Sequence, residues 1–175
     1  MPEKDRSEYK KAADNLYIYE GLGNIGADQI INDVREHIEL TGRRPVVIVD
    51  YLQILAPYDV RYSDKQNIDK DVLELKRLSR DSVIPVVAIS SFNRDSYKGG
   101  ESKTDLTSFK ESGAIEYGSD VLLAMVKGTR TADEGQPVNI KVMKNRNGEK
   151  DRTERFIFQE AHFAFVEAER RSPKY

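Results

Sequence analysis

The sequence predicts an α/β fold in which a parallel-centred sheet is flanked by helices and followed by a C-terminal antiparallel β-hairpin. Two continuous apolar runs, "VVIVD" at 46–50 and "IPVVAIS" at 84–90, are typical of strands buried on both faces of a parallel sheet. Each run follows a segment with helical periodicity, and this alternation predicts right-handed crossovers. Residues 138–159 alternate in period two around Asn147-Gly148, the strongest short hairpin signal in the chain.

The composition indicates an ordinary soluble globular protein. A chain of 175 residues suits one domain, and its formal net charge of -2 means that any nucleic-acid contact must come from a local basic patch. The absence of cysteine excludes disulfides, thiolate metal sites and a cysteine nucleophile. No apolar run reaches membrane-spanning length and the N-terminus lacks the apolar core of a signal peptide, so we expect a cytoplasmic location without membrane contact.

The first half of the chain contains the simpler elements. Residues 1–14 are polar and charged, and a short strand is expected at 16–19. Apolar residues then recur at the spacing of one helix face, which predicts a helix over 27–40. Gly42 follows it and is expected to end the helix in the left-handed conformation.

The second half follows the same reasoning. A helix is predicted over 64–80, before the strand at 84–90. One or two short helices are expected within 105–117, and "DVLLAMV" at 120–126 reads as a third buried strand. The segment "HFAFVEA" at 162–168 is expected to add the last strand.

Three glycines raise the question of a dinucleotide site. Gly21, Gly23 and Gly26 have G-x-G-x-x-G spacing between a predicted strand and helix, and the next apolar run ends in Asp50. However, glycines in such turns usually serve backbone geometry alone, and Glu20 places an anion where a pyrophosphate would bind. An NAD(P)-binding protein is therefore a remote alternative, and loop punctuation is the favoured interpretation of these glycines.

A phosphate-binding P-loop is also absent from the sequence. That motif requires G-x-x-x-x-G-K-[ST], because backbone N–H groups wrap the phosphates while Lys and Ser/Thr reach phosphate and Mg²⁺. The nearest match, "YKGGESKT" at 97–104, has Tyr97 in place of the first glycine and Ser102 before its Lys-Thr pair. It also follows no predicted strand directly.

Asp50 is the first candidate for a functional residue. It follows a predicted parallel strand at its carboxyl end, which is the sheet edge where α/β proteins bind ligands. In nucleoside triphosphatases an aspartate in this position holds Mg²⁺, usually through water. The alternative is an aspartate that caps or braces a loop.

Four segments together resemble the RecA-like motor domain of DnaB-type replicative DNA helicases. They occur in the order of that family and close to its spacing, and they are "VVIVDYLQIL" (Val46–Leu55), "IPVVAISSFNR" (Ile84–Arg94), "LTSFKESGAIEYGSDVLLAM" (Leu106–Met125) and "KVMKNRNGEK" (Lys141–Lys150). The resemblance implies a RecA-like sheet and a partial helicase ATPase domain over 15–168. Residues 1–14 would then be a polar N-terminal segment and 169–175 a C-terminal tail.

The resemblance assigns roles around a nucleotide. Asp50 would be the Walker B aspartate and so a Mg²⁺ ligand, and Gln53 belongs to the same signature and would lie near the cofactor. Ser91 stands where the family has a glutamine that senses the nucleotide phosphate. A hydroxyl cannot span the distance of a glutamine amide, so this coupling is expected to differ from the family.

The resemblance also assigns a DNA-contacting region. The "KESGAIE" segment would place Lys110, Glu111 and Gly113 along the central channel of a ring, with Lys110 replacing an arginine. The Gly/Ser/Lys-rich loop before it would bring further positive charge to the phosphates of single-stranded DNA through Arg94, Lys98 and Lys103. Solvated loop lysines are the simpler alternative.

Lys144 and Arg146 in "KNRNG" resemble the hairpin cations that reach the ATP site of a neighbouring subunit in this family. They would act in trans as an arginine finger, stabilising charge on the transferred phosphoryl group. Their i, i+2 spacing on one strand directs both to the same face. An ordinary charged hairpin tip is the alternative.

The family's P-loop and catalytic glutamate lie before the strand expected at residue 16, and the first 15 residues contain neither. We therefore expect a truncated helicase motor domain that does not hydrolyse ATP by itself and binds neither Mg²⁺ nor ATP tightly alone. Its partners would be single-stranded DNA and, in a ring, copies of itself or full-length helicase subunits. A non-catalytic interaction module that docks on a full-length helicase or on DNA is the alternative.

Overall fold

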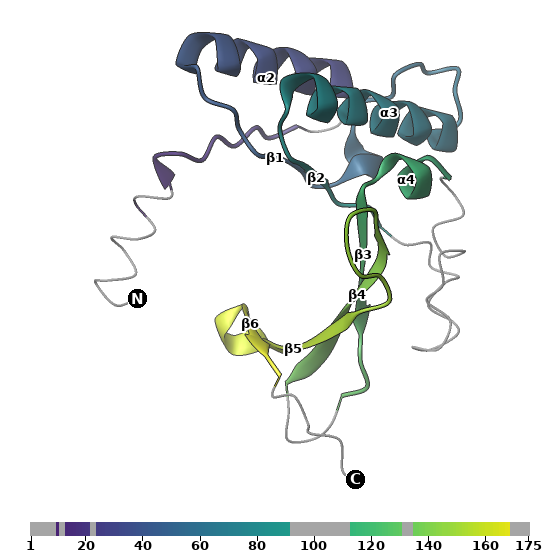
Figure 1. Ribbon diagram of the computed structural model, residues 1–175. Helices are drawn as coiled ribbons and strands as arrows, with labels where there is room; N and C mark the ends of the chain where they lie inside the picture. Colours follow the sequence, from purple (N-terminus) through teal and green to yellow (C-terminus); the bar gives the residue numbers. More distant parts are fainter. Residues whose placement is uncertain (1–9, 11–12, 22–23, 92–112, 131–134, 169–175) are drawn as a thin grey trace.

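The computed structural model describes residues 10, 13–21, 24–91, 113–130 and 135–168 (Figure 1). Its described helices are α2 (Ala27–Thr41), α3 (Asp64–Ser82) and α4 (Gly113–Gly118), with 3-10 turns η1 (Leu52–Ile54) and η5 (Glu160–His162). Its described strands are β1 (Val47–Val49), β2 (Val86–Ala88), β3 (Val121–Lys127), β4 (Gln136–Asn145), β5 (Thr153–Gln159) and β6 (Ala164–Glu167). The α/β class and the predicted long helices are confirmed, with bounds that differ by one or two residues.

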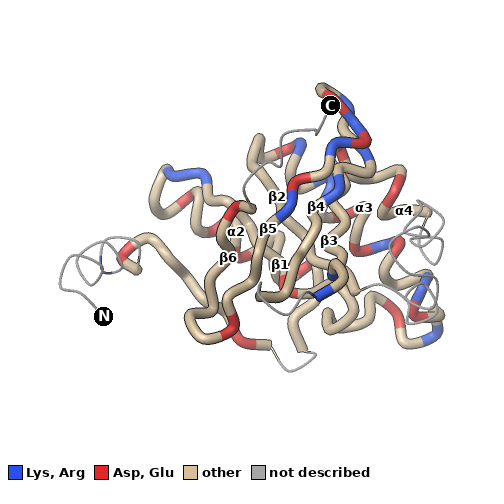
Figure 2. Tube along the Cα trace, turned by 90° about the horizontal axis from the view of Figure 1, so that it is seen from below, with Lys and Arg blue, Asp and Glu red and all other residues tan. Residues whose placement is uncertain are grey.

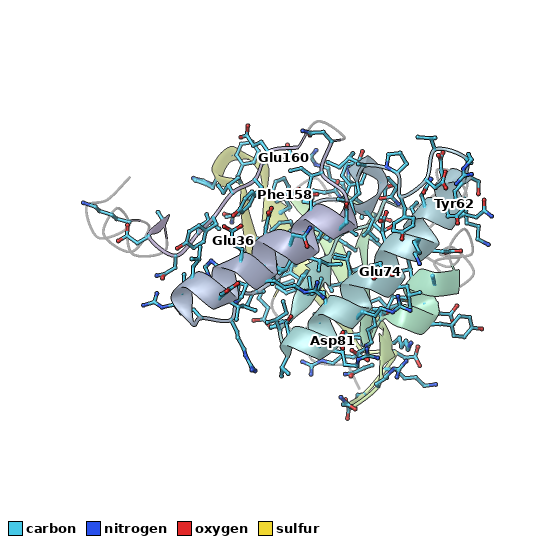
Figure 3. All side chains as sticks on the ribbon, turned by 90° about the horizontal axis from the view of Figure 1, so that it is seen from above. Glu36, Tyr62, Glu74, Asp81, Phe158 and Glu160 are labelled. Atoms are coloured by element: carbon cyan, nitrogen blue, oxygen red, sulfur yellow. The ribbon has the colours of Figure 1, made fainter. Side chains whose placement is uncertain are left out.

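The parallel part of the protein is a two-stranded sheet. β1 pairs with β2 in register Ile48↔Val87, and the chain passes through α3 between them. Helices α2 and α3 lie side by side above these strands (Figures 1 and 3). Two buried apolar clusters lie between the helices and these strands. One contains Val34 of α2, Leu78 of α3 and Ile84 before β2. The other contains Val49, Leu52 and Leu75.

The other face of this parallel pair is exposed, contrary to the expectation of burial on both faces. Ile48 is 65% exposed and Val87 is 50% exposed, although both are large apolar residues. The reason is that both α2 and α3 pack on the same face of β1 and β2. The predicted parallel strand is confirmed, but one of its two apolar faces has no covering layer among the described residues.

The strand expected at residues 16–19 is not formed. These residues have no strand assignment, and all four side chains are more than half exposed. The segment instead touches α2, where the ring of Tyr17 meets His37 edge-on with centroids 5.1 Å apart. A short apolar run therefore predicted a strand for which the structure shows no partner among the described residues.

The C-terminal half is a four-stranded antiparallel sheet of order β3-β4-β5-β6. The strand expected at residues 120–126 is confirmed as β3, and it pairs antiparallel with β4 instead of extending the parallel pair of β1 and β2. Burial alternates along it, with Leu122 and Ala124 buried and Leu123 exposed. In Figure 1 this sheet bends away from the helical layer, so β3 contributes one buried face rather than two.

The hairpin of β4 and β5 is confirmed, but Asn147-Gly148 is not a two-residue turn. The ladder closes where the N–H of Val142 donates to the carbonyl of Arg152 at 2.8 Å, and residues 143–151 extend beyond it. The last residues of β4 pair with β3 instead, with Lys144 opposite Leu122. The end of β4 is thus positioned by β3, next to α4.

Local signals fix the helix ends. Gly42 ends α2 with φ 67, as expected of a glycine in the left-handed region. Ser63 begins α3 with a capping box, in which its hydroxyl accepts from the Gln66 N–H and the Gln66 side chain accepts from the Ser63 N–H. Within the described part of the chain, no helix is both long and apolar enough to span a bilayer.

Candidate functional site

The carboxyl ends of β1 and β2 bring together three residues that the sequence singles out. Asp50 follows β1 directly with its side chain exposed, and Gln53 lies in η1 just after it. Ser91 comes three residues after the end of β2. Because parallel strands end at a common edge, the three residues share the edge at which α/β sheets bind ligands.

Gln53 joins the ends of the two strands. Its Nε2 donates to the hydroxyl of Ser90 at 2.8 Å, and its Oε1 accepts from the N–H of Ser91 at 3.3 Å. A backbone hydrogen bond from Leu52 to the carbonyl of Ile89 lies beside this bridge. Ser90 was not among the predicted site residues, and its position directly before Ser91 was the signal that could have found it.

The side chains at this edge fit a metal ion only in part. Among the residues that the structure describes, no three His, Asp or Glu side chains are grouped closely enough to hold a metal ion alone. Mg²⁺ commonly takes one or two carboxylates and completes its shell with water and substrate phosphates. Asp50 offers one exposed carboxylate at this edge, which is the number that such a Mg²⁺ site takes from the protein at the least.

The glycine segment has a structural explanation. Gly26 is the buried N-cap of α2, and a Cβ there would come within 2.6 Å of the Asp28 carboxylate. Asp28 already brings a negative charge to the first turn of α2, where an anionic ligand would otherwise be favoured. Gly23 lies outside the described residues. These contacts favour a structural role for the glycine in the turn before α2 over a role in binding a dinucleotide.

Lys144 and Arg146 converge on the end of α4. The Nζ of Lys144 donates to the carbonyl of Glu116 at 2.5 Å, and the Nη2 of Arg146 donates to the carbonyl of Tyr117 at 3.2 Å. The last carbonyls of a helix have no partner within the helix, so they readily accept hydrogen bonds from cations. Both side chains thus reach adjacent carbonyls at the end of α4, which agrees with the common face predicted from their i, i+2 spacing.

A carboxylate completes this group of cations. Asp120 pairs with Lys76 of α3 through Oδ2 and with the Nε of Arg146 at 3.5 Å through Oδ1. The hydrogen bond from Lys76 is the main reason that the pKa of Asp120 lies below its usual range, and the charges of Lys76, Arg146 and Lys144 contribute to the same shift. Sequence reasoning missed Lys76, which has no distinguishing neighbours on a helix rich in charge, and it treated Asp120 only as the start of a strand.

The predicted DNA-contacting residues are described only at one end. Gly113 begins α4 and is partly buried, whereas Arg94, Lys98, Lys103, Lys110 and Glu111 lie outside the described residues. Figure 2 shows basic and acidic residues interspersed along the described chain in this view, rather than a uniformly basic face. The assignment of a DNA-binding loop therefore stays a prediction from the sequence.

Comparisons with known proteins identify related sequences. A family model described as "DnaB-like helicase C terminal domain" matches residues 4–167. The replicative DNA helicase DnaB of Haemophilus influenzae is 29% identical over 145 residues, which are 79% of this chain and 30% of that protein. The DnaB of Mycobacterium leprae is 30% identical over 106 residues, which are 59% of this chain and 18% of that protein. The matches thus span less than a third of each relative.

Solved structures confirm the fold. A solved structure described as an ATPase domain superposes with a TM-score of 0.74 at 23% identity, covering 83% of this chain and 52% of that one. A DnaB-like replicative helicase, whose structure was described with its interactions with primase, superposes with a TM-score of 0.78 at 22% identity and covers 97% of this chain and 42% of that one. The arrangement of helices and strands is therefore that of RecA-like helicase ATPase domains.

Proposed function

The chain belongs to the family of DnaB-like helicase C-terminal domains, and we propose that it forms part of the ATP-driven motor of a replicative DNA helicase. The observation that carries this proposal is the meeting of Asp50, Gln53 and Ser91 at the carboxyl edge of two parallel strands. In the proposed motor this edge faces the triphosphate.

Each residue at this edge has a separate task in the proposal. A bound Mg²⁺ would neutralise charge on the phosphates. Asp50 would hold that ion, usually through water, because its exposed carboxylate directly follows β1 at the carboxyl edge of the sheet. Gln53 keeps the ends of β1 and β2 at a fixed separation through Ser90 and Ser91. Ser91 occupies the position of a longer side chain in the family, so this chain would transmit the state of the nucleotide differently.

Lys144 and Arg146 act on a neighbouring subunit in this proposal. A fixed pair of cations stabilises the charge that develops on a transferred phosphoryl group. Their convergence at the end of α4 supports a paired action, since both side chains lie within reach of adjacent carbonyls. Single-stranded DNA would contact the segment that precedes α4 in the sequence, through the basic residues that it contains.

We further propose that the 175 residues alone do not hydrolyse ATP. Phosphate binding in such motors depends on the backbone of a P-loop, and the sequence contains no G-x-x-x-x-G-K-[ST] motif. Calorimetry with Mg·ATP tests this, since a Kd tighter than about 10 μM would contradict it. DNA-stimulated hydrolysis that disappears on Asp50→Ala but persists in Asp33→Ala would contradict it as well.

The proposed DNA contact has its own test. Phosphate contacts make affinity fall steeply as salt rises. We expect binding of a fluorescent oligodeoxythymidine to be salt-dependent and to be lost on charge reversal at Lys98, Lys103 and Lys110. Reversal of Lys65 and Lys70 on α3 together with Lys127 on β3 serves as the matched control, because it changes the net charge by the same amount. If the affinity changes neither with salt concentration nor with charge reversal at Lys98, Lys103 and Lys110, these lysines do not bind DNA.

A non-catalytic docking module is the second candidate. The exposed apolar face of β1 and β2 favours it, because a large uncovered apolar surface commonly marks a protein interface. Mixing the chain with a complete DnaB-type helicase separates the candidates. Inhibition of the ATPase that survives Lys144→Ala and Arg146→Ala but is lost on Ile48→Glu supports docking alone.

A further inference from the structure

Asp120 and Arg146 are fixed opposite each other by the backbone. Asp120 immediately precedes β3, and Arg146 immediately follows β4. The N–H of Arg146 donates to the carbonyl of Asp120 at 2.9 Å, which extends the ladder one step beyond the pair of Val121 and Asn145. The two side chains therefore start from a common, hydrogen-bonded position at the end of the sheet.

The Asp120 carboxylate is shared between two elements. One oxygen accepts from Lys76 on α3, and the other lies 3.5 Å from the Nε of Arg146. α3 is anchored elsewhere by buried Leu75 and Leu78, which flank Lys76 in the sequence. Lys76 thus ties the carboxylate to the rigid helical layer, so the orientation of Asp120 does not depend on the hairpin alone.

We propose that Asp120, anchored by Lys76, is a positioning residue for the Lys144–Arg146 pair. The carboxylate holds the guanidinium of Arg146 over the Tyr117 carbonyl, while Lys144 occupies the neighbouring Glu116 carbonyl. Both cations are then presented together in a limited set of rotamers. Three cations surround one carboxylate, so the group keeps a surplus of positive charge for an incoming anion. This inference rests on the proposed function, in which the two cations act on the phosphoryl group at the ATP site of a neighbouring subunit.

The exposure of these side chains separates positioning from stability. Lys76 is 35% exposed, Asp120 54% and Arg146 53%. Exposed ion pairs contribute little to the stability of a fold, yet restricting a long side chain changes its rotamer freedom strongly. Removal of the Asp120 charge is therefore expected to leave the chain folded while it releases Arg146.

The test follows the Arg146 side chain by NMR in the 175-residue protein. The Nε–Hε signal is assigned by its absence in Arg146→Lys, and its steady-state heteronuclear NOE is measured. We expect Asp120→Asn and Lys76→Met each to shift this signal and to lower its NOE toward that of a free arginine. Lys76→Met is the sharper variant, because Lys76 binds the Asp120 carboxylate and, as a cation, cannot itself hydrogen-bond to Lys144 or Arg146.

The control is Lys70→Met, which removes an ion pair with Glu74 on the same helix. It is expected to leave the Arg146 signal unchanged. Asp120→Glu, which keeps the charge, is expected to restore part of the NOE. An Arg146 signal that is unaffected by both Asp120→Asn and Lys76→Met, in variants whose amide spectra show a folded chain, overturns the inference.

A second measurement distinguishes this inference from the proposed function. The chain is mixed with a DnaB-type helicase whose own finger cations are replaced by alanine, and the ATPase of the mixture is recorded. If the chain restores ATPase activity, and Asp120→Asn lowers the kcat of the restored activity several-fold without changing the KM for ATP, the result supports both the trans finger and the positioning role of Asp120. Recovery in which Arg146→Ala has no effect refutes the trans finger, while the NMR result still decides whether Asp120 positions Arg146.

Discussion

Gln53 reaches from the turn after β1 to the end of β2, where its Nε2 donates to the Ser90 hydroxyl at 2.8 Å. The two strands that it joins are each three residues long and share one parallel register. The Gln53 bridge adds two side-chain hydrogen bonds to the backbone hydrogen bonds between these two strand ends. The same bridge keeps Ser91 close to the turn that follows Asp50. Gln53 therefore contributes both to the stability of the fold and to the arrangement of the proposed site.

Replacement of Gln53 is expected to destabilise the protein. Gln53→Ala removes both hydrogen bonds, and we expect the free energy of unfolding to fall by about 1 kcal/mol. Urea denaturation followed by far-UV circular dichroism measures this change. The matched control is Gln29→Ala, which removes a hydrogen bond to Asp33 on the exposed face of α2. Equal losses in the two variants would show that the bridge has no special role.

Asp71 makes stability depend on pH. It is 3% exposed, its Oδ1 has no hydrogen-bond partner, and burial together with the Asp28 charge raises its pKa from 3.8 to about 6. The folded chain therefore binds more protons than the unfolded chain between these pKa values. Its contribution to stability is full below about pH 4, is lost as the pH rises toward about 6, and stays lost above it.

Asp71→Asn removes this dependence. At pH 7 we expect the variant to be more stable than the parent by up to about 3 kcal/mol, since each pKa unit corresponds to about 1.4 kcal/mol. The difference is expected to vanish near pH 4. Urea titrations at several pH values provide the measurement, with Glu149→Gln on the exposed β4–β5 connection as the control. A constant difference between Asp71→Asn and the parent across this range would contradict the assignment.

The capping box of α3 offers a test of local structure. The Ser63 hydroxyl accepts from the Gln66 N–H at 3.3 Å, and the Gln66 Oε1 accepts from the Ser63 N–H at 2.9 Å. Ser63→Ala removes the side-chain acceptor of the Gln66 N–H and is expected to cost about 1 kcal/mol. Ser63→Asp keeps an acceptor and is expected to cost much less. Thermal unfolding of the three proteins measures the order, and a similar loss in both variants would argue against the cap.

The C-terminus of α3 is strained and can be improved. Val83 adopts φ 53 and ψ 54, a left-handed conformation that a β-branched residue rarely takes, and it is 66% exposed. Val83→Gly relieves this strain at little loss of packing, so we expect stability to rise by about 1 kcal/mol. Val83→Ala is the comparison variant, because it keeps the Cβ that disfavours this conformation. Chemical denaturation that ranks Val83→Gly below the parent would refute the strain argument.

The fold was largely predictable because local signals and periodicity agree in the helices. Gly42 was predicted to end α2 and does so, and the helix predicted from residue 64 begins there as α3. The strands were predicted less well, because an apolar run such as 46–50 does not reveal whether one or both faces will be covered. The apolar run at 120–126 likewise does not indicate whether the neighbouring strand is parallel or antiparallel. The direction of pairing depends on residues far away in the sequence.

The candidate site was predictable where it depends on strand ends and spacing. Asp50 and Ser91 follow β1 and β2, so their common edge could be inferred from the order of the elements. The pairing of Asp120 with Lys76 joins residues 44 positions apart, and no local pattern indicates it. Contacts of this kind follow from tertiary packing, which only the structure supplies.

Ile48 and Val87 are register partners on the uncovered side of the parallel pair, and both expose large aliphatic groups to water. Such a surface lowers colloidal solubility, because two molecules that meet there release ordered water from both. We expect a dye that fluoresces on apolar surfaces to brighten with the native chain and to dim with the double variant Ile48→Thr, Val87→Thr. In that case this exposed side of two short strands contributes to the self-association of the folded chain, separately from any association of unfolded molecules.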